Sequence, residues 1–117
     1  MGSIVVASCG CGYEKEMNLG GGMMNFETYC GFPVYCPACE QLFVANLFVE
    51  PIRCPECGSH GVLPYDADEL CEKKGAVVFE WFVRDRNDRA LELTNGEYLC
   101  PDCGQFTLSF HMRGFWD

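Results

Sequence analysis

Paired cysteines are the feature that most constrains how this chain can fold. The sequence has ten cysteines in 117 residues, and eight of them form four close pairs, at 9 and 11, 36 and 39, 54 and 57, and 100 and 103. So high a cysteine content in a short chain indicates either a disulfide framework or metal sites. The choice between the two depends on the compartment and on the chemistry of each pair.

The amino-terminal segment favours a reducing compartment. Residues 1–9 contain no basic side chain, and their apolar run is too short for a secretory signal peptide. The chain also lacks a stretch approaching the roughly 18 apolar residues of a membrane span. We therefore expect a cytoplasmic protein without membrane contact, whose thiols stay reduced and whose cysteine pairs bind metal.

Three of the pairs have the composition of metal-binding knuckles. Two residues between the cysteines let both sulfurs reach one ion at about 2.3 Å. Proline presets φ in the turn, and the glycines at Gly58 and Gly104 permit a positive φ where backbone amides approach the sulfur. Glu40 stands in place of this glycine after the 36–39 pair. The fourth pair, Cys9-Gly-Cys11, is assigned as ligands because a tetrahedral site needs four.

Eight cysteines suffice for two four-thiolate sites, each expected to hold Zn²⁺, with iron less favoured. The 36–39 knuckle recurs at 100–103, including a glutamine two residues later. If both copies close a site, the pairs combine sequentially, as Cys9, Cys11, Cys36 and Cys39 and then Cys54, Cys57, Cys100 and Cys103. Two alternatives remain: the compactly spaced middle pairs share one ion and the outer pairs another, or the pairs interleave as a cross-brace.

Local patterns predict a small, mostly β fold with one short helix around 66–74, where acids precede two lysines and Gly75 follows. Residues 76–84 are β-branched and aromatic, and Asn95-Gly96 favours a hairpin, so a three-stranded antiparallel meander should lead into the last knuckle. Glu50-Pro51 is the predicted junction between a first unit, 1–50, and a second, 51–117. A two-residue junction is too short for a free linker, so we expect the units to pack together.

These features resemble the zinc-ribbon superfamily, and the resemblance covers most of the chain twice over. It implies two tandem zinc ribbons, which are modules used in transcription, translation and protein assembly. Cys11-Gly12-Tyr13 is similar to a rubredoxin knuckle, which would imply an iron electron carrier, but Ser8 stands where the first rubredoxin ligand would fall. The charged turn at 84–89 is similar in position to the hairpin tip of transcript-cleavage factors, but it lacks their adjacent acids.

Charge and coordination favour a non-enzymatic interaction or regulatory module. The formal charge is −9, and eight thiolates with two divalent ions bring it to about −13. A nucleic-acid backbone repels such a surface, so a basic protein partner is favoured over a transcription-associated ribbon that touches RNA polymerase or nucleic acid. A closed four-thiolate site leaves no position for activating water, so we do not expect an enzyme. The oligomeric state is open, homo-oligomers included.

Several other side chains have weaker assignments. Cys30 and Cys71 are interpreted as free thiols, and either would be the candidate nucleophile of an enzyme. The two histidines, His60 and His111, are not needed by two complete cysteine sets. Aromatic residues supply a candidate partner surface, and the arginines supply the contacts for the nucleic-acid alternative. The aromatic set is Phe79, Trp81, Phe115 and Trp116 with Val78, Phe82 and Val83, and the arginines are Arg84, Arg86, Arg89 and Arg113.

Overall fold

The computed structural model describes residues 2–21, 29–47, 52–83 and 89–116. Within these ranges the chain is mostly β, with almost no helix, which confirms the predicted fold class. In chain order the elements are β1 (Gly2–Cys9), β2 (Glu14–Leu19), β3 (Gly31–Cys36), β4 (Gln41–Asn46), β5 (Leu63–Pro64), the 3₁₀ turn η1 (Asp68–Leu70), β6 (Cys71–Lys73), β7 (Val77–Val83), β8 (Arg89–Thr94), β9 (Glu97–Tyr98) and β10 (Leu108–Trp116). Every described strand pair is antiparallel.

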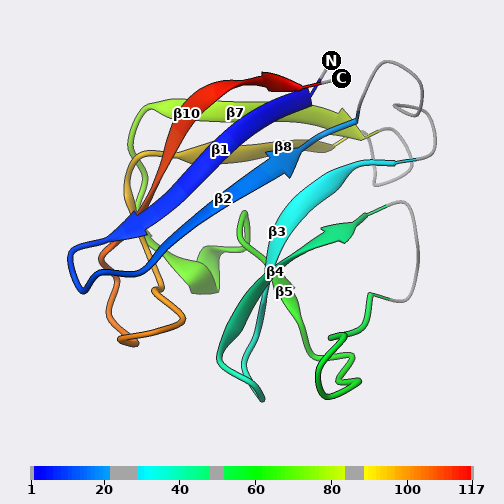
Figure 1. Cartoon of the computed structure of the whole chain (residues 1–117), viewed down its shortest axis with the longest axis vertical. Coiled ribbons are helices and arrows are strands. Elements are labelled where there is room, and N and C mark those ends of the chain that lie inside the picture. Colours follow the sequence, from blue (N-terminus) through cyan, green and yellow to red (C-terminus); the bar gives the residue numbers. More distant parts are fainter. Residues whose placement is uncertain (1, 22–28, 48–51, 84–88, 117) are drawn as a thin grey trace.

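The largest sheet joins the two ends of the chain. Its strand order is β2-β1-β10-β9-β6, and β1 pairs with β10 from Gly2 opposite Trp116 to Cys9 opposite Leu108. The two strands therefore run side by side along one edge of the molecule, with the chain termini together (Figure 1). Both predicted units, 1–50 and 51–117, contribute strands to this sheet.

A second, three-stranded sheet has the order β4-β3-β5, and β7 and β8 form a separate hairpin. The two larger sheets meet at Gly20 and Gly31, whose backbones exchange hydrogen bonds of 2.8 and 2.9 Å. Gly20 has φ +78°, and a Cβ there would lie 2.8 Å from the ring of Trp81. Only glycine fits this junction without strain, because both the backbone conformation and the close ring exclude a side chain.

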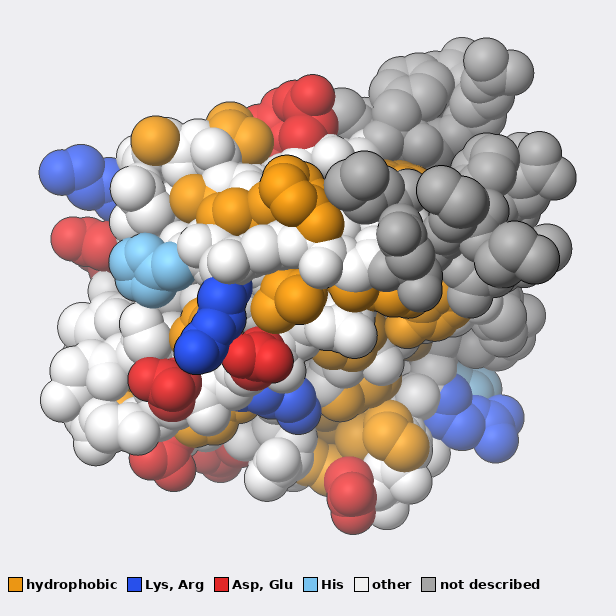
Figure 2. All heavy atoms as spheres, turned by 45° about the horizontal axis from the view of Figure 1, so that its top comes forward, with side chains coloured by type: hydrophobic (Ala, Val, Ile, Leu, Met, Phe, Trp, Pro, Cys, Tyr) orange, Lys and Arg blue, Asp and Glu red, His pale blue; other side chains and the backbone are white. Residues whose placement is uncertain are grey.

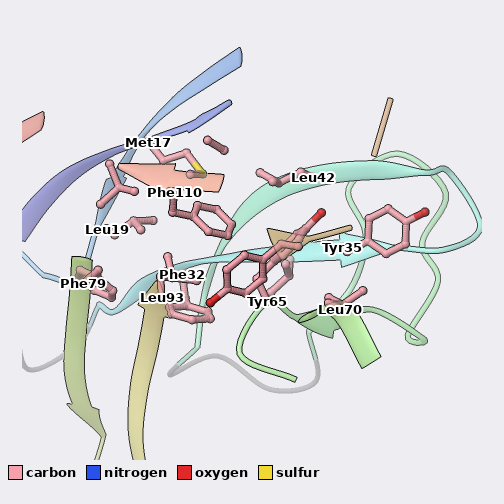
Figure 3. Packing of buried hydrophobic residues seen from close by; sticks show 14 of the residues in the cluster. Met17, Leu19, Phe32, Tyr35, Leu42, Tyr65, Leu70, Phe79, Leu93 and Phe110 are labelled. Carbon is pink, nitrogen blue, oxygen red and sulfur yellow. The ribbon is translucent and has the colours of Figure 1, made fainter. Parts of the chain in front are cut away.

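One hydrophobic core fills the space between these sheets. Tyr65, which is fully buried, lies near its centre, with ring centroids 5.6 Å from Phe110 and 6.2 Å from Tyr35. Figure 3 shows Tyr65, Phe32 and Phe110 gathered between the layers. The Tyr65 hydroxyl donates a 2.9 Å hydrogen bond to the Leu99 carbonyl, so its polar atom is satisfied inside the core. Residues on both sides of the predicted junction share this core.

The segment 65–99 differs from the predicted helix and meander. The helix expected around 66–74 is only the turn η1, because Ala67 is extended and gives no side-chain cap, and the chain becomes strand β6 at Cys71. After β8, the backbone N–H of Asn95 donates to Ala76 and its side chain accepts from the same residue. Asn95-Gly96 therefore carries the chain out of the β7–β8 hairpin, and β9 pairs with β6 and β10 rather than with β8.

Candidate metal centres

The eight predicted ligands come together in two groups of four. Within each group the sulfur atoms all lie within 4.8 Å of one another. We call the first group the terminal site and the second the inner site. The terminal site is Cys9, Cys11, Cys100 and Cys103, and the inner site is Cys36, Cys39, Cys54 and Cys57.

This grouping corrects the sequential pairing favoured by the sequence and matches its first alternative. The reason is strand pairing. β1 carries Cys9 and lies beside β10, which follows the knuckle at 100–103. β3 carries Cys36 and lies beside β5, which follows the knuckle at 54–57. Each site therefore takes two ligands from each side of residue 50.

The distances between sulfurs fit one tetrahedral ion per site. In the terminal site, Cys9 lies 3.7 Å from Cys103 and Cys11 lies 3.7 Å from Cys100. A tetrahedral ion with bonds of about 2.3 Å to sulfur places its ligands about 3.8 Å apart. None of the ten cysteines, all of which lie among the described residues, is in a disulfide, and these separations are far longer than the S–S bond of about 2.05 Å.

The inner site has the same dimensions. Cys36 lies 3.6 Å from Cys57, and Cys39 lies 3.7 Å from Cys54. Cys36 and Cys54 are buried, whereas Cys57 is exposed. The donor set in both sites is four thiols, which is a set that Zn²⁺ and iron both accept.

Two of the knuckles are structurally equivalent. The N–H of Cys54 donates to Ser59, and the N–H of Cys100 donates to Gln105, at 3.0 and 2.8 Å. In each knuckle the glycine after the second cysteine returns a hydrogen bond to the first cysteine's carbonyl, and both glycines have φ +73°. In the 36–39 knuckle Cys36 pairs with Gln41 in the same way, so all three knuckles repeat one backbone arrangement.

The knuckle at 36–39 forms the same return hydrogen bond without glycine. The N–H of Glu40 donates to the carbonyl of Cys36 at 2.8 Å, and Glu40 has φ +53°. This is the left-handed region, which costs a non-glycine residue roughly 1–2 kcal/mol. The 36–39 knuckle therefore has the same turn as the other two, but its backbone is strained at Glu40.

The two ribbons are nested rather than tandem. Each consists of a hairpin whose tip carries one cysteine pair, followed by a knuckle and a strand that returns beside the hairpin's first strand. The inner ribbon is continuous from β3 to β5. The terminal ribbon is split, with β1 and β2 at the start of the chain and β10 at its end, so the inner ribbon is inserted within it (Figure 1).

Backbone hydrogen bonds lower the pKa of one thiol in each site. The N–H of Cys11, aided by the Thr107 hydroxyl, lowers the pKa of Cys9 to about 6. The N–H of Cys57 lowers the pKa of Cys54 to about 7. Burial raises the pKa of Cys100 to about 12, because the charged form is poorly solvated. Cys9 and Cys54 therefore ionise at a lower pH than ordinary thiols.

Thr107 is the residue that sequence reasoning missed. Its hydroxyl lies 2.9 Å from the sulfur of Cys9 and 3.7 Å from that of Cys103. A hydroxyl that donates to a ligating thiolate stabilises its charge and fixes its orientation. No local motif marks Thr107, because the contact with Cys9 depends on the pairing of β1 with β10.

The remaining cysteines and histidines lie outside both groups. Cys30 is buried, and its N–H donates to the Asn46 side chain. Cys71 is half-buried, and burial raises its pKa. His60 accepts a 3.0 Å hydrogen bond from the Nε of Arg53, and His111 is exposed on β10.

Most of the described side chains in the predicted aromatic surface pack against other parts of the molecule. Phe79 is 3% exposed, and Trp81 stacks on it at 6.4 Å. Trp116 donates from Nε1 to the Leu19 carbonyl at 3.0 Å, so the end of β10 docks on the fold. Among the described aromatic side chains of this set, Phe115 is the most open to solvent, at 64% exposure. The side chains of Phe82, Val83, Arg84, Arg86 and Arg89 lie outside the described residues.

Comparisons with protein-family models, with curated proteins and with solved structures find no match to this chain. Among the described residues, no helix is long and apolar enough to cross a membrane.

Proposed function

We propose that this chain is a non-enzymatic, metal-stabilised interaction module that holds one Zn²⁺ in the terminal site and one in the inner site. The observation that carries the proposal is the grouping of eight thiols into two sets with tetrahedral spacing. Each set supplies four thiolates, which complete the coordination of a structural zinc ion. The bound ions would supply crosslinks between distant parts of the backbone and balance half of the thiolate charge.

The position of the sites supports a structural role. The terminal site joins the β1–β2 tip to the knuckle before β10, and the inner site joins the β3–β4 tip to the segment before β5. Without metal, the hydrophobic core of this small protein would have to hold these segments together by itself. A rigid frame of this kind presents strand surfaces to a partner with little loss of conformational entropy.

The surface chemistry supports a protein partner. The formal charge of −9, which becomes more negative when the thiolates bind two divalent ions, steers basic partners toward the chain. On the face shown in Figure 2, hydrophobic side chains lie among scattered acidic and basic ones. We place this module in a reducing, cytoplasmic environment, because free thiols persist there.

Three measurements test the proposal. Elemental analysis of the chain purified under reducing conditions should give two zinc atoms per chain, and a strong chelator should lower the temperature at which the β-sheet signal in circular dichroism is lost. Affinity capture should then recover a partner with the wild-type chain and with Cys71→Ser, but not with the ligand variant Cys11→Ser/Cys39→Ser. Two iron atoms with a reversible redox couple, or a partner retained by the ligand variant, would contradict this function.

A further inference from the structure

Strand β4 has a hydrogen-bonding edge that faces away from its sheet. Val44 lies opposite Pro33 in the β3–β4 pair. The carbonyl of Pro33 accepts a hydrogen bond from Tyr65 on its other side, and proline has no N–H. Pro33 therefore makes no backbone hydrogen bond to β4. In an antiparallel pair, the residue across from such a position points its own N–H and C=O away from the partner strand. The N–H and C=O of Val44 are therefore directed outward.

Lys15 closes one end of this edge. Leu42 lies two residues before Val44, so its backbone groups have the same direction. The Leu42 carbonyl accepts a 3.2 Å hydrogen bond from Nζ of Lys15, which comes from β2 of the other sheet. A lysine at an edge of this kind blocks further strand pairing. The N–H and C=O of Val44 lie farther along the edge, where Lys15 does not block pairing.

A groove of about 390 Å³ runs along the part of the edge that Lys15 does not cover. Its walls are residues 43–46 of β4 and, across from them, Ile52, Arg53 and Pro55. Consecutive residues of a strand point to opposite faces, so a groove lined by four in a row follows the strand's edge rather than one face. We call it the β4 groove.

We propose that the β4 groove binds an extended segment of a partner protein, which adds a strand beside β4, places apolar side chains in the groove and directs a carboxylate to Arg53. This inference rests on the proposed function as an interaction module and names the surface it uses. The segment's backbone would accept from the N–H of Val44 and donate to its C=O, as in strand addition to other sheet edges. The guanidinium of Arg53 is oriented by its 3.0 Å hydrogen bond from Nε to His60, which does not involve its two terminal nitrogens.

The charges of the groove and of the chain favour a different protein over a second copy of this chain as the occupant of the β4 groove. Arg53 is the charged residue among those that line the described groove, and it calls for an acidic side chain opposite it. Two copies docked edge to edge would bring together chains that each carry a formal charge of −9. An apolar segment with one acidic residue satisfies both the groove and Arg53, and it can belong to a partner whose remaining surface is basic.

The test selects peptides on the metal-loaded chain. A library of random dodecapeptides displayed on phage is panned against the immobilised chain, and the most enriched peptides are synthesised. We expect alternating apolar residues with one Asp or Glu, and we expect the Val44 amide to become protected from hydrogen exchange when the peptide binds. N-methylation of the peptide at the residue opposite Val44 should weaken binding about tenfold, because it removes one backbone hydrogen bond.

Variants of the chain complete the test. Val44→Pro should weaken binding about tenfold, whereas Val44→Thr, which keeps the N–H, should not. Arg53→Gln should weaken only peptides that contain the acidic residue. Native mass spectrometry of each variant should still show two ions, which separates loss of the groove from loss of the metal frame. Equal binding to Val44→Pro and Val44→Thr, no enriched peptide below a Kd of about 1 mM, or a dimer that Val44→Pro abolishes would each overturn the proposal.

Discussion

The sulfur of Cys9 lies 3.7 Å from the sulfur of Cys103, which is 94 positions later in the chain. In the inner site the corresponding contact, between Cys36 and Cys57, spans only 21 positions. An ion in the terminal site would therefore close a loop that contains nearly the whole chain, including the inner ribbon. Because crosslinks over longer loops restrict the unfolded chain more, the terminal ion is expected to hold the two ends together.

Removal of the Thr107 hydroxyl should weaken the terminal site selectively. Thr107→Val keeps the side-chain shape but loses the 2.9 Å hydrogen bond to the Cys9 sulfur. Loss of a hydrogen bond to a metal ligand typically lowers metal affinity about tenfold or more. Competition with a chromophoric chelator should show this loss at one ion and an unchanged affinity at the other.

Thr107→Ser is the matched control, because it keeps the hydroxyl. It should restore the zinc affinity of the terminal site to within about twofold of wild type. If Thr107→Val and Thr107→Ser lower the affinity equally, packing of the methyl group rather than the hydrogen bond explains the effect.

Relief of strain at Glu40 should stabilise the folded protein. Glu40→Gly places glycine at φ +53°, where the other two equivalent knuckles already have it. The expected gain in the free energy of unfolding is about 1 kcal/mol, since relief of strain exceeds the added flexibility of the unfolded chain. Urea denaturation of the metal-loaded protein measures it.

The reverse substitution provides the comparison. Gly104→Ala should cost about 1 kcal/mol through conformation alone, because a Cβ at Gly104 meets no atom within 4 Å and φ is +73°. A destabilised Glu40→Gly would show that the Glu40 side chain makes a contribution larger than its strain.

Zinc affinity should fall as the pH falls, with a slope that changes near pH 6 to 7. Each ion requires four thiolates, so protons compete with the metal. The pKa of Cys9 is lowered to about 6 and that of Cys54 to about 7, so above these values one thiol in each site is already ionised. The slope of log affinity against pH should therefore decrease by about one as the pH rises through about 6 at the terminal site and about 7 at the inner site. A slope that stays constant from pH 5 to 8 at both sites would contradict these shifts.

Local chemistry in the sequence predicted the fold class and the eight cysteines that gather in two groups. Each C-x2-C knuckle is a turn whose residues act on one another at close range, so the cysteines that form the two groups could be read from spacing. The β-branched and aromatic run at 76–84 likewise became β7, with bounds close to those expected. These features depend on neighbours in the chain, which sequence patterns report directly.

Long-range pairing explains what sequence reasoning missed. Which cysteines share an ion depends on β1 lying beside β10, and no pattern within either strand specifies its partner. The Asn95-Gly96 signal is present, but hydrogen bonds from Asn95 to Ala76 redirect the chain. The role of Thr107 follows from the same long-range pairing, since it contacts a sulfur 98 positions away.

The most direct test of two nested four-thiolate sites counts the ions bound by two double variants, using native mass spectrometry under reducing conditions. The wild-type chain should carry two ions. Cys11→Ser/Cys103→Ser removes two ligands from the terminal site and should retain one ion, whereas Cys11→Ser/Cys39→Ser damages both sites and should retain none. The opposite result, with no ion in the first variant and one in the second, would show that the pairs combine sequentially and would contradict the nested arrangement.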